Sequence, residues 1–192
     1  RLRTLLGARR PVQELRRLLR ELRMPARRPA DADGTALDPV AAALVVRDNL
    51  RQRRTIERAY IEAIRAAHQR IDIVSPYFYP ARAFRVALRE AARRGVRVRL
   101  LMQGRWDYRF AELAARAVYD ELLGHGIEIH EYQPAFLHAK VTVIDEEWAT
   151  VGSSNIDRLS LLLNLEANVI VRDAPLAAAL RAELDEAFAA SH

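Results

Sequence analysis

The chain has 192 residues, of which 51% are hydrophobic and 29% charged, and its formal net charge is +6. This length and composition suit a globular domain with a sizeable core. The absence of cysteine excludes a disulfide framework and thiolate chemistry. No apolar run reaches the roughly 18–20 residues of a membrane-spanning helix.

The positive charge is concentrated in residues 1–30. These residues hold ten arginines against Glu14 and Glu21, a balance of +8, so the rest of the chain sums to about −2. Apolar residues recur at helical spacing between the arginines, which predicts a basic amphipathic helix. Such a helix could lie on an anionic membrane surface or serve as a connector packed on a neighbouring domain. Prolines and a short polar run then predict a linker, so we divide the chain into residues 1–40 and a domain of residues 41–192.

Beyond residue 42, strand-like and helix-like stretches alternate. Short apolar runs predict strands, and amphipathic stretches that end near glycine predict helices. The predicted order is strand 43–46, helix 55–69, strand 71–74, helix 81–94, strand 96–102, helix 108–123, strand 127–132, a strand through His138, a return strand ending at Gly152, strand 167–172 and helix 175–190. This pattern predicts an α/β fold with a mixed, largely parallel sheet that is flanked by helices on both faces.

His138 and Lys140 lie in a stretch where apolar and polar residues alternate. In a strand, their side chains point to the same face and stand roughly 6–7 Å apart, with Thr142 beside them. The other face carries Leu137, Ala139, Val141 and Val143. Lys140 is the only lysine among 31 basic residues. Because lysine is a compact point charge, we interpret Lys140 as a phosphate ligand beside a group that can attack or carry a proton.

The return strand ends in Gly152, Ser153, Ser154 and Asn155. A tight turn after Asp145 would bring these residues alongside the His138 strand. Glycine allows close backbone approach, and serine and asparagine supply short hydrogen-bond donors that suit a phosphate oxygen.

Together these residues resemble the signature of the phospholipase D superfamily. That signature is His-x-Lys, four residues, Asp, six residues, then Gly-Ser-x-Asn, and every spacing is met by His138, Lys140, Asp145, Gly152, Ser153 and Asn155. Within the superfamily, residues 44–186 are most similar to the C-terminal half of bacterial cardiolipin synthases of the B type. Residues 46–49, 76–80, 91–97 and 148–155 carry this similarity. The resemblance implies a phospholipase D-like fold and no cofactor.

The resemblance also implies roles for these residues. His138, Lys140, Asp145 and Glu166 form the expected catalytic set, in which Glu166 would hold the second nitrogen of His138. Glu166 could instead be a surface carboxylate. Asp145 belongs to the motif, but it ends its strand, so we expect it to be structural and to fix the hairpin.

Further residues are expected to bind the substrate. Lys140 and Asn155 would hold the phosphate oxygens, with Ser153 and Gly152 in support. Tyr77 and Phe78 follow strand 71–74, where they would line the rim of a lipid pocket or simply pack in the core. The other histidines have no partner at metal-ligand spacing, so no metal site is expected.

A phosphohistidine route needs two histidines, and this chain has one motif. By the resemblance, the second comes either from another motif in the same chain or from a dimer mate. We favour a fragment whose first half is absent. The expected function is phosphatidyl transfer that forms cardiolipin from phosphatidylglycerol and a second phospholipid, with His138 as general acid and then base.

Two alternatives remain open: a dimeric single-motif phosphodiesterase, either a phospholipase D or a nuclease, and a half that only binds membrane. Nucleic acid is not expected as a partner because the basic excess lies outside the catalytic domain. The expected partners are a phospholipid substrate, an anionic membrane surface and a second phospholipase D-like half. The expected location is cytoplasmic, peripheral to the inner membrane.

Overall fold

The computed structural model describes residues 40–48, 52–105, 116, 118–157, 160–161 and 163–192. The predicted basic helix and most of predicted helix 108–123 lie outside these residues. The described elements are β1 (Ala41–Arg47), α2 (Thr55–Ala66), β2 (Arg70–Val74), β3 (Phe78–Tyr79), α3 (Arg82–Arg93), β4 (Arg97–Gln103), α5 (Tyr119–Leu123), β5 (Glu128–Tyr132), β6 (Val141–Ile144), β7 (Trp148–Gly152), β8 (Ile156–Asp157), β9 (Glu166–Arg172) and α7 (Ala174–Ala189).

One predicted strand begins later than the sequence pattern indicates. β6 starts at Val141, so His138 and Lys140 lie in the irregular segment that leads into it. The predicted alternation of faces holds for Leu137 and within β6. Leu137, Val141 and Val143 pack in the cluster beneath α7, whereas Thr142 is buried on the opposite face.

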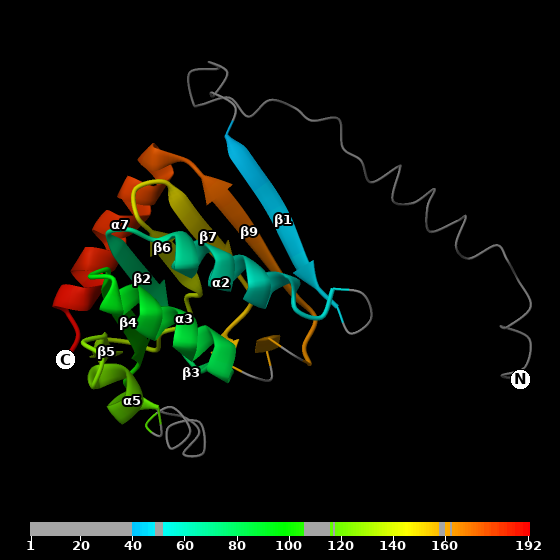
Figure 1. The fold of residues 1–192 in the computed structure, drawn as a ribbon. Coiled ribbons are helices and arrows are strands. Elements are labelled where there is room, and N and C mark those ends of the chain that lie inside the picture. The colour runs from blue at the N-terminus through cyan, green and yellow to red at the C-terminus, as the bar shows by residue number, and fades with distance from the viewer. Residues whose placement is uncertain (1–39, 49–51, 106–115, 117, 158–159, 162) are drawn as a thin grey trace, which may run out of the picture. The chain divides into compact units, whose positions relative to one another are not determined.

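Seven strands form one sheet in the order β1-β9-β7-β6-β2-β4-β5 (Figure 1). β4 lies between β2 and β5 and is parallel to both, because a helix lies in the chain between each of these strands and the next. The pairings from β1 across to β2 are antiparallel, and the short turn between β6 and β7 makes those two strands a hairpin. The sheet is therefore mixed, as predicted, but its parallel part is confined to one side.

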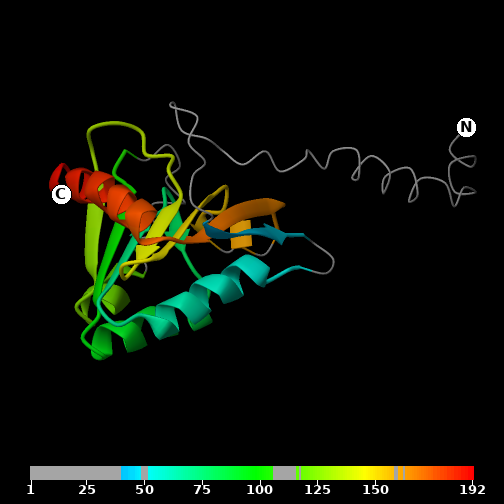
Figure 2. The same ribbon diagram turned by 90° about the horizontal axis from the view of Figure 1, so that it is seen from above.

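Helices cover both faces of the sheet, as predicted. Figure 2 shows α2 and α3 on one face and α7 on the other. The core beneath α2 and α3 is the larger one, and in it the Tyr60 ring packs edge to face with Trp148 and at a tilt with Phe84. A second cluster lies beneath α7 and includes Leu184 and Phe188. None of the described helices is both long and apolar enough to cross a membrane.

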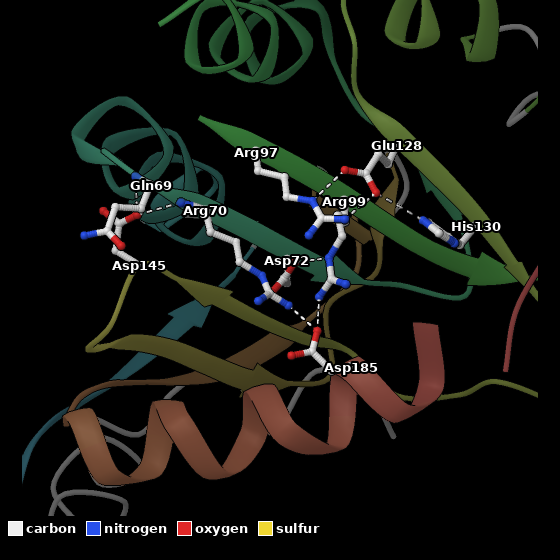
Figure 3. Close-up of polar contacts among 9 residues, drawn as sticks. All are labelled: Gln69, Arg70, Asp72, Arg97, Arg99, Glu128, His130, Asp145 and Asp185. Carbon is white, nitrogen blue, oxygen red and sulfur yellow. Dashed lines mark hydrogen bonds and ion pairs between the residues drawn. The ribbon is translucent and has the colours of Figure 1, made fainter. Parts of the chain in front are cut away.

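A cluster of ion pairs centred on buried Asp72 and Arg99 joins α7 to the sheet (Figure 3). The Asp72 carboxylate on β2 is fully buried and lies 2.6 Å from Arg70 Nε and 2.7 Å from Arg99 Nε. Asp185 of α7 pairs with Arg70 and, at 2.6 Å, with Arg99. The Arg99 guanidinium also lies 3.9 Å from the centre of the Phe188 ring. Because buried charges need partners, this cluster fixes where α7 crosses the sheet.

Candidate active site

Apart from Asp145, the predicted residues of the motif gather at one end of the sheet. Lys140 precedes β6, Gly152 ends β7 and Glu166 begins β9, and these strands are neighbours. The backbone N–H of Gly152 donates to the Lys140 carbonyl at 3.2 Å, and Gly152 pairs with Asn168 of β9. The structure therefore brings together residues that are up to 28 positions apart in the sequence.

Lys140 is a buried cation at the edge of this site. Its side chain is 7% exposed, and its Nζ donates to the His138 carbonyl oxygen at 2.8 Å. Burial lowers the pKa of the Lys140 ammonium, and the nearby Glu166 carboxylate partly opposes that change. A buried ammonium is costly, and an anion that binds beside it would relieve that cost.

His138 is exposed, and the backbone before it is held by a buried side chain. The Oε1 of Gln103, at the end of β4, accepts a hydrogen bond from the Leu137 N–H at 3.1 Å. This bond fixes the irregular segment to the sheet one residue before the histidine. Sequence reasoning did not give Gln103 this role, because its partner is 34 residues away and no local pattern indicates the contact.

Glu166 and Ser153 form the opposite side of the site. The Ser153 hydroxyl donates to the Glu166 carboxylate, which also accepts from Asn164 Nδ2 at 3.4 Å. Ser153 is further tied to β9 through Ala167, whose carbonyl accepts from Ser153 N at 3.0 Å. No hydrogen bond joins Glu166 to His138 among the described residues. The predicted role of Glu166 in orienting the histidine is therefore not visible in this arrangement.

Gly152 lies where two strands come closest. A Cβ at this position would lie 2.3 Å from Asn168 Oδ1 and 2.6 Å from the Ala167 carbonyl oxygen, so only glycine fits. Asn168 is itself buried, and its Nδ2 donates at 3.4 Å to both Tyr60 and Thr150. Burial raises the pKa of Tyr60 to about 12, so this hydroxyl stays protonated at neutral pH. Asn168 is a second supporting residue that the sequence analysis did not single out.

The Asn155 turn is braced by the segment that contains Tyr77 and Phe78. The Ser75 hydroxyl accepts from Ile156 N at 3.0 Å and donates to the Tyr77 carbonyl at 2.7 Å. β3 and β8 then pair in parallel. Phe78 is 1% exposed and packs against Phe84, so its side chain supports the core and does not face solvent. Tyr77 is half-buried.

Asp145 lies at the other end of β6, roughly 16 Å along the chain from Lys140. Its carboxylate accepts from the backbone N–H groups of His68, Gln69 and Arg70 at 2.8–3.0 Å (Figure 3). Burial alone would raise the pKa of Asp145, but these three donors outweigh it and lower the pKa. This position supports the expected structural role. These contacts hold the entry into β2, and a role of Asp145 in fixing the hairpin stays a prediction.

A cavity of about 390 Å³ lies at the Asp145 end, lined in part by Asp145, Trp148 and Arg172. It contains neither His138 nor Lys140. In the described part of the chain, no three His, Cys, Asp or Glu side chains are placed to bind a metal ion. What the site offers is therefore an exposed imidazole, a buried ammonium and a carboxylate, a set that suits acid–base chemistry on a phosphate ester.

Comparisons with known proteins give a consistent result. The family described as "Cardiolipin synthase, PLD-like domain" matches residues 60–188. The chain is 46% identical to cardiolipin synthase B of Escherichia coli K12 over 147 residues, which are 77% of this chain and 36% of that relative. It is 43% identical to cardiolipin synthase A of Pseudomonas aeruginosa over 132 residues, which are 69% of this chain and 27% of that relative. The chain thus spans about a third of the length of these relatives.

Among solved structures, Nuc from Salmonella typhimurium, a phospholipase D family member, has a similar fold. The TM-score is 0.69 at 20% sequence identity, and the match covers 80% of this chain and 97% of Nuc. This likeness concerns the fold alone.

Proposed function

Since the chain belongs to the family of cardiolipin synthase phospholipase D-like domains, we propose that it supplies one of the two catalytic motifs of a phosphatidyltransferase. The product would be cardiolipin, formed from phosphatidylglycerol and a second phospholipid. The observation that carries this proposal is the buried ammonium of Lys140 bonded to the backbone of an exposed His138. A cation held in place beside an imidazole suits a phosphodiester whose negative charge increases on attack.

The proposed reaction needs two imidazoles. A histidine of a second unit would attack phosphorus and form the phosphohistidine, while His138 protonates the leaving hydroxyl oxygen. Neutral His138 would then remove the proton from the acceptor lipid's hydroxyl group, which attacks the phosphohistidine and releases the free histidine. Lys140 and Asn155 would hold the phosphate oxygens in both steps.

Glu166 would act through its neighbours. Its hydrogen bond from Ser153 and its electrostatic effect on Lys140 support a role for its negative charge beside the phosphate. A rotation of the exposed His138 ring toward this carboxylate on substrate binding would fix the tautomer of the imidazole. Residues 1–30, with their excess of arginine, would hold the protein peripherally on an anionic membrane surface.

The test uses a chimera in which this chain replaces the matched stretch of E. coli cardiolipin synthase B. Labelled phosphatidylglycerol in mixed micelles should give cardiolipin, and His138→Ala should lower the rate by about 100-fold or more. Phosphatidic acid as the only product would instead show a hydrolase. Cleavage of DNA without any lipid product would favour a nuclease. Either result, or a folded chimera without product, would overturn the proposal.

A further inference from the structure

An uncovered row of aliphatic side chains crosses three neighbouring strands. Leu44 of β1 and Val151 of β7 both lie directly opposite Val169 of β9. Their exposed fractions are 69%, 47% and 42%, respectively. Val46, in the next row, is 39% exposed. We call Leu44, Val46, Val151 and Val169 the apolar sheet surface.

This surface lies on the face of the sheet that carries α7. Ala149 packs in the cluster beneath α7, and Val151, two residues further along β7, points to the same face. α7 packs over β5, β6 and β7, and Figure 2 shows no described helix over β9 and β1 on this side. On the opposite face, Val45 and Ile170 pack in the core. The described residues thus cover these strands on one face only.

Exposed aliphatic residues scattered singly are ordinary, but a row of them in register is a contiguous apolar patch. Such patches on a sheet mark sites of association. β1 is also an edge strand, bonded only to β9 among the described strands. An apolar face beside an open edge favours association with another folded unit.

The apolar sheet surface adjoins the candidate active site. Val151 immediately precedes Gly152, and Val46 lies opposite Ala167, the neighbour of Glu166. A unit that binds this surface would therefore lie only one or two residues of β7 or β9 away from Gly152 and Glu166. That is where the proposed reaction needs a second histidine.

We infer that the apolar sheet surface is the docking surface for a second phospholipase D-like unit carried by the same longer polypeptide. This inference rests on the proposed function, which requires that unit. The E. coli relative has nearly two thirds of its sequence outside the match. That remainder is long enough to hold the second unit that would cover this surface. The four side chains carry no charge, so a second apolar face can cover them without burying an unpaired ion.

Hydroxyl-radical labelling of side chains tests this surface directly. The full 192-residue chain and the chimera are labelled under the same conditions, and modification of Leu44, Val151 and Val169 is quantified by mass spectrometry. Labelling of these residues should fall several-fold in the chimera. Leu123, at the end of α5, is 50% exposed and serves as the matched control, whose labelling should not change.

A pair of variants links the surface to the site. In the chimera, Val151→Asp should restore labelling at Val169 and lower cardiolipin formation at least tenfold, whereas Leu123→Asp should do neither. In the chain alone, Val151→Asp should leave thermal unfolding unchanged because the side chain is already exposed. Unchanged labelling between chain and chimera would overturn the inference, even if cardiolipin is formed.

The remaining outcomes distinguish the inference from the proposed function. Protection of the surface without cardiolipin would support the docking surface and refute the function. Protection in the chain alone that grows with protein concentration would assign the surface to a second copy. Protection in the chain alone that disappears when residues 1–39 are removed would assign it to the chain's own N-terminal segment. Either assignment would overturn the inference.

Discussion

The close approach at Gly152 gives the sharpest prediction for a single substitution. In Gly152→Ala, the new methyl group would lie 2.3 Å from Asn168 Oδ1 and 2.6 Å from the Ala167 carbonyl oxygen. Neither atom is free to move away. Asn168 is held by Tyr60 and Thr150, and the Ala167 carbonyl accepts from Ser153 N.

The expected cost follows from these contacts. Overpacking in a closely packed region destabilises by about 1–3 kcal/mol. Separating β7 from β9 also weakens the hydrogen bond between Ser153 and Ala167, which contributes about 1 kcal/mol. We therefore expect Gly152→Ala to lower the free energy of unfolding by about 2–4 kcal/mol. This is a large part of the roughly 5–15 kcal/mol of an ordinary domain, yet the protein should stay folded at 25 °C.

Urea denaturation followed by far-UV circular dichroism measures this loss. The matched control is Gly126→Ala, where φ is +76° and an added Cβ meets nothing within 4 Å, so only about 1 kcal/mol of backbone strain is expected. In the chimera, Gly152→Ala should lower cardiolipin formation about 100-fold because Ser153 is displaced, and Gly126→Ala should not change it. Equal stability and activity for the two variants would refute the argument from close approach.

Three further predictions concern buried or paired charges. Lys140→Met should lower cardiolipin formation by about 100–1000-fold but leave the protein at least as stable at pH 7, measured by urea denaturation. The reason is that burial holds the pKa of Lys140 in the folded protein below its unfolded value, so the charged form disfavours folding. The free energy of unfolding of the unsubstituted protein should therefore rise as the pH passes the folded-state pKa, up to the unfolded value of about 10.4. Asp72→Asn should lower the free energy of unfolding by about 3–5 kcal/mol because the buried Arg99 loses the Asp72 carboxylate. A loss under about 1 kcal/mol would contradict a stabilising role for this ion pair. Burial alone would raise the pKa of Asp185, but Arg99 and Arg70 lower it. Stability from this pairing is therefore present above about pH 4 and lost as the pH falls further, and Asp185→Asn should flatten that acid-side decline in a pH series of thermal melts.

Most of the fold in the described residues was predictable from hydrophobic periodicity, for physical reasons. Apolar residues that recur at helical spacing in α2 and α3 bury one face. The buried strands β2 and β4 carry short apolar stretches, at residues 73–74 and 100–102, beside their charged residues. Strand direction was harder to predict because it depends on which strands become neighbours. β6 pairs antiparallel with β2, and β7, β9 and β1 follow it in the sheet. All the pairings on that side are therefore antiparallel.

The motif residues were predictable because their spacing is fixed in the sequence, whereas their supports were not. Gln103 and Ser75 act through backbone groups 34 and 81 residues away, so no local pattern reveals them. Phe78 shows the opposite case. It lies in a stretch that resembles the family, yet its side chain is in the core, because resemblance gives a position in the chain and not the direction of a side chain.

We propose that His138 and Lys140 are half of a phosphatidyl-transfer site, which a second unit of the same longer polypeptide completes. The most direct measurement is turnover of labelled phosphatidylglycerol by the full 192-residue chain alone, side by side with the chimera. We expect cardiolipin from the chimera and none from the chain alone. Cardiolipin made by the chain alone and abolished by His138→Ala would contradict it, because two copies would then suffice to build the site.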